Sequence, residues 1–395
     1  MQDKFGLDLS DFSKELKWML LLLQNNRDKE EILSHIPVDM DWSLFLQLVM
    51  HHRVYPLVFT KLREMDSELI PEHVIESLSA EYKRNTFQML QLSAELERVC
   101  KVFDEHGIRS LQLKGPVIAK ELYGDISLRT SKDLDILVPF ADIEKVEGIL
   151  RMLGYVLTDE INRVLDDWKW RIHHLSYFHP GKRILIEMHW KQSPNITNEP
   201  SFDELWSRRN TSSFTKNGIH FLGVEDLFLY LVSHGARHSW FRLRWLADIK
   251  QLLNKEFEWE KVHSHLKRYD CHYLAGQALI LANQLLATPI KQEIKPIMAS
   301  SRSFMLAQNA MEFIKNMVEL CVEFSDKKLA ESYKIYTLSL MSKKQKWRQH
   351  LFKLFPSSAD ALALPLPKIL HFLYFPLRPF LWCWRRLKWP AKLIK

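Results

Sequence analysis

The sequence predicts a mixed α/β or α+β protein, in which a small core with a mixed sheet lies between helical regions. Eleven glycines among 395 residues are few, which favours long helices over glycine-rich β folds. Apolar residues recur at helical spacing towards both ends, whereas strand and helix patterns alternate between about residues 108 and 222. We therefore expect a helical region at 1–84, a core at 85–222, a second helical region at 223–345 and a basic aromatic tail at 346–395.

The N-terminal region is expected to be helical throughout. Apolar residues at helical spacing predict helices around residues 18–22 and 45–49, and prolines at 37, 56 and 71 separate the helical segments. A further amphipathic helix is predicted from about 84 to 106, before Gly107. The apolar run at 18–23 is too short to span a bilayer, and the acidic residues before it are not typical of a signal peptide.

The core region alternates strands with helices. Pro116 suits the first position of a helix, Gly154 suits a helix end, and Pro180-Gly181 predicts a hairpin turn. We expect strands at 108–113, 133–138, 155–157, 174–178 and 183–190, and helices at 116–123 and 141–153. From residue 224 the helical pattern returns and continues to about 345.

Composition narrows the class of protein. Apolar residues make up 47% and charged residues 26% of the chain, which is typical of soluble proteins. The four cysteines are far apart and form no C-x-x-C pair, so neither a zinc site nor a disulfide framework is predicted. A reducing cytoplasm is the location that this cysteine usage favours.

The net charge of +7 is concentrated at the C-terminal end. Residues 341–395 carry twelve Lys and Arg against the single acid Asp360, a balance of +11 that leaves −4 for the rest. Most of the molecule thus lacks the basic surface typical of nucleic-acid binding. Four prolines between residues 362 and 389 argue against a transmembrane helix. The tail can dock onto the body, adsorb to an anionic inner membrane surface, or contact nucleic acid.

Two carboxylates one residue apart open the strand predicted at 133–138. Residues i and i+2 of a strand share a face, so Asp133 and Asp135 project side by side. Glu187 lies within an apolar strand, where an isolated carboxylate is costly unless it is paired or binds a metal. Three carboxylates converge if these strands are neighbours, and Mg²⁺ favours carboxylate oxygens. Because unpaired carboxylates repel, we expect them to contribute little to the stability of the metal-free fold.

Four motifs occur in a fixed order along the chain. They are Leu113-Lys114-Gly115, then Arg129 before Asp133 and Asp135, then Glu187-Met188-His189-Trp190, and last His234, His238, Arg244-Trp245 and Asp248. This order resembles the nucleotidyltransferase superfamily, with its polymerase-β-like fold, and more closely a bacterial family of uncharacterised nucleotidyltransferases. The resemblance covers residues 85 to 255.

The resemblance implies an enzyme that uses Mg²⁺ or Mn²⁺ to transfer a nucleoside monophosphate from an NTP such as ATP. The acceptor would be a small molecule, a sugar phosphate, a peptide or a protein. Asp133, Asp135 and Glu187 would be the catalytic residues and metal ligands. The nucleotide-binding residues would be Lys114, Gly115, Arg129, His234, His238 and Arg244.

Two alternatives to this function stay open. In one, Pro116 follows Gly115 where active relatives carry Gly-Ser or Gly-Gly, so a backbone N–H donor is missing and the chain is a non-catalytic binding or scaffold module. In the other, the acceptor is an RNA end that the basic tail guides.

Several of the motif residues also suit structural roles. His234 and His238 are spaced to share a helix face, where they could pack, bind zinc or line a cleft. Arg244 and Asp248 are likewise spaced for a simple ion pair on one helix, and Glu187 could pair with Arg129 or Arg183.

Overall fold

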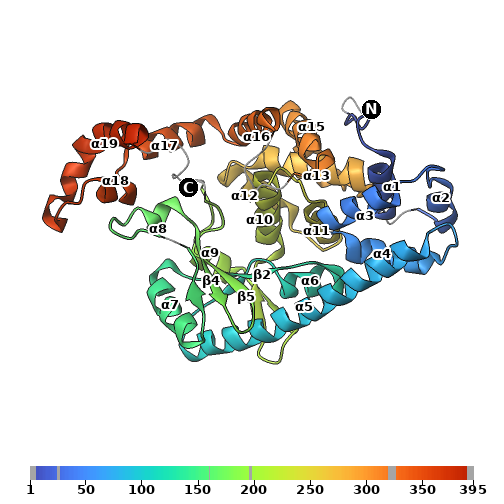
Figure 1. Cartoon of the computed structure of the whole chain (residues 1–395), viewed down its shortest axis with the longest axis horizontal. Helices are drawn as coiled ribbons and strands as arrows, with labels where there is room; N and C mark the ends of the chain where they lie inside the picture. Colours follow the sequence, from blue (N-terminus) through green and yellow to red (C-terminus); the bar gives the residue numbers. More distant parts are fainter. Residues whose placement is uncertain (1–5, 25–26, 160, 195–197, 319–325, 389–395) are drawn as a thin grey trace.

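The computed structural model describes residues 6–24, 27–159, 161–194, 198–318 and 326–388. Figure 1 shows a mixed sheet with helices from both halves of the chain packed around it. The sheet has seven strands and is flanked by helical regions on both sides in sequence. The predicted fold class is therefore confirmed.

The N-terminal region consists of five helices. They are α1 (Lys14–Leu22), α2 (Lys29–Ser34), α3 (Trp42–His51), α4 (Tyr55–Met65) and α5 (Glu72–Glu105). The helix expected from about residue 84 is the later part of the 34-residue α5, which runs along the sheet as far as α7 (Figure 1). The division placed between residues 84 and 85 thus falls inside one continuous helix, whose apolar side packs on both the N-terminal helices and the sheet.

The sheet order is β3-β4-β5-β2-β1-β7-β6. The strands are β1 (Leu111–Gln112), β2 (Asp133–Leu137), β3 (Val156–Leu157), β4 (His174–His179), β5 (Ile184–His189), β6 (Asn210–Ser212) and β7 (Ile219–Phe221). At its centre β2 runs parallel to β5 and antiparallel to β1. Strands β4 and β5 form the predicted hairpin across residues 180–183. The observed β1 is shorter than the strand predicted at 108–113.

Four helices connect the strands of the core. They are α6 (Pro116–Tyr123), α7 (Ile143–Met152), α8 (Trp168–Arg171) and α9 (Phe202–Ser207). Pro116 is the first residue of α6, as the sequence predicts, and Gly124 ends the helix in a left-handed conformation. This places α6 directly after the Lys114-Gly115 turn.

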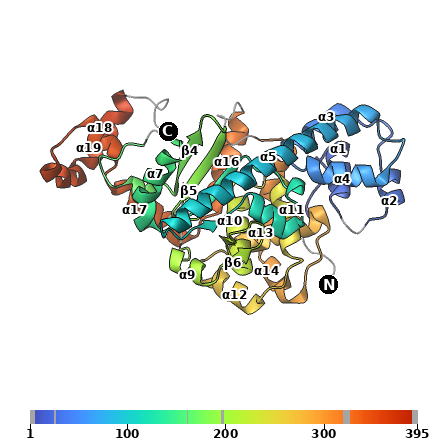
Figure 2. The same cartoon turned by 90° about the horizontal axis from the view of Figure 1, so that it is seen from below.

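The second helical region covers the other side of the sheet. Its helices are α10 (Val224–Arg237), α11 (Arg244–Leu252), α12 (Trp259–Arg268), α13 (His272–Leu286), α14 (Lys295–Met298), α15 (Ser301–Lys315) and α16 (Lys327–Ser339). Figures 1 and 2 show α5 on one side of the sheet and α10 and α11 on the other. One large apolar core joins these helices to the sheet and to the N-terminal helices.

The last described residues form an extension that we call the C-terminal arm, residues 343–388. It contains α17 (Lys343–Leu354), α18 (Ser358–Ala363), a 3₁₀ turn η4 (Lys368–Leu373) and α19 (Tyr374–Lys388). The arm projects from the body at the end away from the N-terminal helices (Figure 1). It has a small apolar cluster of its own around Tyr374. Among the described residues, no helix has the length and apolar character needed to cross a membrane.

Candidate active site

The centre of the sheet brings the predicted acids together. Parallel pairing of β2 with β5 sets Asp135 directly opposite Glu187 and Asp133 opposite Leu185. Residues two apart on a strand share a face, so Asp133 lies on the same face as the Asp135–Glu187 pair. Asp135 is fully buried, whereas Asp133 and Glu187 are partly exposed. The strands β2 and β5 are therefore neighbours, as the convergence of the three carboxylates requires.

Two of the three carboxylates, those of Asp135 and Glu187, have partners, whereas the sequence analysis treated the acids as unpaired. The Nζ atom of Lys114 lies 2.8 Å from Oδ1 of Asp135. The Nε2 atom of His189 lies 3.2 Å from the same oxygen and 3.3 Å from Oε2 of Glu187. Lys114 and His189 are themselves almost buried. A cation and an imidazole therefore offset part of the negative charge of this cluster.

The pKa shifts show that this cluster favours a mixed state of ionisation. Burial and the neighbouring Asp135 raise the pKa of Asp133. Burial acts in the same direction on Asp135, but Lys114 and His189 outweigh it and hold the pKa of that carboxyl well below its usual range. Burial disfavours the charged form of Lys114 too, yet Asp135 and its neighbours raise the pKa of the amine. Asp135 and Lys114 are thus an ion pair, and Asp133 is the acid whose ionised form is disfavoured.

The turn before α6 depends on glycine. Gly115 has φ 88° and ψ −153°, which residues with a side chain rarely adopt. Its Cα also lies close to β2, since an added Cβ would stand 3.8 Å from the carbonyl oxygen of Asp133. The turn therefore sets Lys114 and the start of α6 against the strand that carries the acids.

The two arginines of the motifs have different partners. Arg129 binds Asp248 with two nitrogens, at 2.9 to 3.2 Å, and the hydroxyl of Tyr123 donates to the same carboxylate at 2.9 Å. Asp248 thus pairs with Arg129 and not with Arg244, the partner considered from spacing. Arg129 thereby ties the segment before β2 to α11.

Arg244 keeps no carboxylate partner in the described residues. Its Nη1 atom donates to the carbonyl oxygen of Thr130 at 2.6 Å and to the Thr130 hydroxyl at 3.1 Å. Burial and the nearby cations Arg53 and Arg129 lower the pKa of Arg244 to about 9. An anionic ligand would stabilise the charged form of this side chain.

His234 of α10 and His238, the residue that follows this helix, lie together, and His234 is beside Lys114. The Nε2 atom of His234 is 3.4 Å from Nζ of Lys114, and the rings of His234 and His238 are 4.6 Å apart. Trp245 packs against both rings. Burial lowers the pKa of each histidine well below its usual value, so both are neutral. Their positions fit contact with Lys114 and packing on Trp245.

The comparisons with known proteins agree with this geometry. The model of a family described as "Uncharacterised nucleotidyltransferase" matches residues 39–287, well over half of the chain. The chain belongs to this family. The match begins before α3 and ends after α13, so the nucleotidyltransferase unit includes N-terminal helices as well as the sheet, and it excludes the C-terminal arm. No curated protein and no solved structure matches the chain significantly.

The candidate site contains histidines that were not among the site residues predicted from sequence. His189 and His174 are cross-strand partners on β5 and β4, and His173 precedes His174. The ligand atoms of these three residues lie within 4.8 Å of one another, as do those of Asp135, Glu187 and His189. The sequence did contain a signal for His189, because residues two apart on a strand share a face and His189 follows Glu187 by two.

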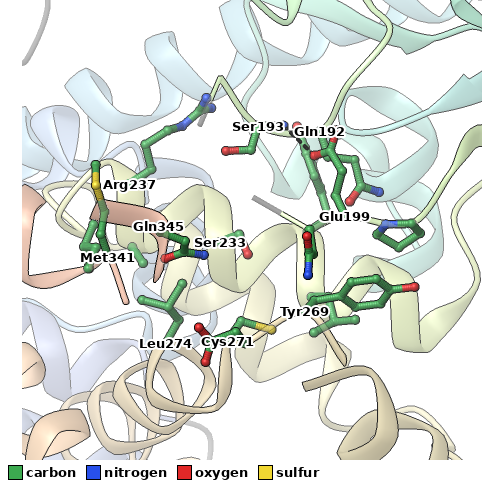
Figure 3. A pocket seen from close by; sticks show the side chains of 17 residues that line it. Gln192, Ser193, Glu199, Ser233, Arg237, Tyr269, Cys271, Leu274, Met341 and Gln345 are labelled. Atoms are coloured by element: carbon green, nitrogen blue, oxygen red, sulfur yellow. Dashed lines mark hydrogen bonds between the residues drawn. The ribbon is translucent and has the colours of Figure 1, made fainter. Parts of the chain in front are cut away.

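A pocket opens beside these side chains. Its empty space, which is open to solvent, is about 820 Å³. Figure 3 shows Arg237, Ser233, Gln345 and Glu199 around it. Arg237 links the pocket to the site, because its Nη1 atom lies 3.1 Å from Nε2 of His173. Burial raises the pKa of Glu199 to about 7. The pocket thus combines a cation and a titratable acid with an apolar wall, and it reaches the histidines of the candidate site through Arg237.

Proposed function

We propose that this chain transfers a nucleoside monophosphate from an NTP to an acceptor, in a reaction that requires a divalent cation. The observation that carries the proposal is the set of Asp133, Asp135 and Glu187 on one sheet face beside Lys114. Paired carboxylates with an adjacent cation suit phosphoryl chemistry, in which catalysis is mostly positioning and charge stabilisation. Membership of the nucleotidyltransferase family supports the same class of reaction.

The residues present fit a divalent cation. Oδ2 of Asp135 and Nδ1 of His189 are buried and have no hydrogen-bond partner in the described part of the chain. Asp135, Glu187 and Asp133 would hold the ion, which would polarise the reacting phosphate and stabilise the leaving pyrophosphate. Oxygen ligands suit Mg²⁺ and Mn²⁺, and a neighbouring imidazole suits Mn²⁺ better than Mg²⁺.

The remaining side chains would orient substrates and neutralise charge. Lys114 is the cation closest to Asp135, so it is placed to neutralise phosphate oxygens that approach the acids. Arg244 is a buried cation without a carboxylate partner in the described residues, which favours an anionic ligand. Glu187 is partly exposed opposite Asp135, so, as an alternative to binding the ion, it is placed to take the proton of an acceptor hydroxyl.

The pocket beside Arg237 has room for the part of a substrate that lies beyond the reacting phosphate. Its mixture of apolar, amide and charged side chains suits a small molecule or a peptide segment. The first 340 residues carry a net charge of −4, which does not favour an RNA acceptor.

Incubation of the full chain with each α-labelled NTP, Mg²⁺ or Mn²⁺, and fractionated cell extract tests this function. We expect label to move to an acceptor fraction with wild-type protein and not with Asp133→Asn, while Lys132→Ala, an exposed neighbour, retains transfer. Label on RNA alone would favour the RNA-end alternative. Absence of transfer with every nucleotide and fraction, despite metal-dependent nucleotide binding, would favour a non-catalytic binding module.

A further inference from the structure

The C-terminal arm buries one carboxylate with two arginines and exposes many large apolar side chains. Asp360, the only acid after residue 341, is fully buried. Both of its carboxylate oxygens lie 2.6 Å from Nη1 of Arg378, and Nη2 of Arg385 lies 2.9 Å from Oδ1. These arginines share the inner side of α19 with Tyr374 and Leu381, at the three- and four-residue spacing of a helix face.

The outer side of the arm is apolar. Of the 23 exposed large apolar side chains in the described residues, twelve lie in this short arm. Ile369 is 83% exposed and Phe380 72% exposed, more than most exposed apolar side chains of the body. The other exposed apolar residues of η4 and α19 include Phe372, Phe375 and Leu387. In water this arrangement costs free energy, since burial of an apolar side chain is favourable. An apolar medium or partner must cover this side.

The charges of the arm indicate which partner covers its exposed apolar side. Lys343, Lys344, Lys353 and Lys368 of the arm are exposed, and the arm's one acid is already neutralised by arginine. The combination of exposed aromatic rings and lysines without exposed acid matches the interface of an anionic bilayer. The 15-residue α19 is about 22 Å long, shorter than the roughly 30 Å apolar layer of a bilayer, so it would lie in the interface plane.

We propose that the C-terminal arm adsorbs to anionic phospholipid membranes and holds the nucleotidyltransferase unit at their surface. Ile369, Phe372 and Phe380 enter the boundary between headgroups and acyl chains, and the lysines contact lipid phosphates. The membrane would be the cytoplasmic face if the chain is cytoplasmic, as its cysteine usage predicts.

The arm is fastened to the body at its base. The hydroxyl of Ser358 donates to Oδ1 of Asp167 at 2.5 Å, and Nη2 of Arg171 donates to the carbonyl oxygens of Phe355 and Pro356. Leu165 of the body packs into the arm's apolar cluster. Docking onto the body, one of the positions expected for the tail, therefore holds for α17 and the start of α18. Because the arm is attached to the body, contact of the arm with a membrane would fix the position of the active site relative to that membrane.

Sedimentation of the full chain with vesicles tests the proposal. Vesicles of equal parts phosphatidylcholine and phosphatidylglycerol should bring the protein down, vesicles of phosphatidylcholine alone should not, and added salt should weaken binding. The double variant Phe372→Ser/Phe380→Ser should bind at least tenfold more weakly. Both side chains are exposed, so the fold is retained, which circular dichroism will show.

Phe87→Ser is the matched control, because Phe87 is 73% exposed on α5, outside the arm. It should bind vesicles as the wild type does. Absence of binding to the anionic vesicles overturns the proposal. So does self-association in light scattering that the double variant abolishes while vesicle binding stays unchanged, since a second copy of the chain would then cover the arm.

Discussion

The ion pair between Lys114 and Asp135 leads to a quantitative prediction about stability. The two charged atoms are 2.8 Å apart, and Asp135 has no exposed surface. Removal of one partner from a buried pair costs about 3–5 kcal/mol, because the other charge stays buried. Asn at position 135 keeps the shape and one acceptor for the ammonium, so we expect Asp135→Asn to lower the unfolding free energy by about 3 kcal/mol. Asp133→Asn should leave it unchanged or raise it, because that carboxylate is repelled by Asp135.

Urea unfolding of the metal-free protein at pH 7, followed by tryptophan fluorescence, measures both values. The difference depends on pH in a defined direction. The lowered pKa of Asp135 means that its carboxylate stabilises the fold above the ordinary pKa of about 4, and that this stability is lost as the pH falls further. The deficit of Asp135→Asn should therefore shrink below about pH 4. Equal stability of the two variants at pH 7 would refute the ion pair.

Three further predictions concern the surroundings of the site. Burial raises the pKa of Glu199 to about 7, so its ionised form lowers the stability of the fold above pH 7. This loss of stability disappears as the pH falls from 7 towards the ordinary pKa of a glutamate. Glu199→Gln should thus raise the thermal midpoint at pH 8 and not near pH 4, and an equal gain at both would show another cause. Lys114→Ala should weaken NTP binding in calorimetry more than Lys132→Ala, because Lys132 is exposed, and equal losses would remove Lys114 from the phosphate site. Arg129→Lys and Asp248→Asn should each destabilise the fold by about 1–3 kcal/mol in urea, and the double variant should lose less than their sum, whereas additive losses would contradict the pair.

Much of the fold could be predicted from local patterns. The residue spacing in α5, the Pro116 start of α6 and the turn at residues 180–183 are encoded by neighbours in sequence, and each was expected. The short strands β6 and β7 were not assigned, because three residues cannot show a period and their pairing depends on the rest of the sheet. The continuity of α5 from residue 72 was also missed, since its first turns pack on the N-terminal helices.

In the site too, features that depend on neighbours in sequence were predicted, and contacts between distant residues were not. The acids were expected because carboxylates are costly in apolar strands, and β2 and β5 proved to be neighbours. The contact of Lys114 with Asp135 could not be deduced, because Lys114 comes from the turn before α6, whereas the place of His189 beside Glu187 could have been read from the period of two along β5. The pairing of Arg129 with Asp248 joins residues 119 positions apart, whereas spacing alone favoured the nearer Arg244. Helical spacing shows which residues share a face, but it does not show which distant residue a side chain meets.

Calorimetric titration of the full chain with ATP, in Mg²⁺, in Mn²⁺ and in EDTA, tests most directly whether the acids form a metal-dependent nucleotide site. We predict binding in the presence of either cation, none in EDTA, and loss of binding in Asp133→Asn, whose fold should remain stable. Equal ATP binding in EDTA, or unchanged binding by a folded Asp133→Asn variant, would contradict the assignment of this sheet face as the nucleotidyltransferase site.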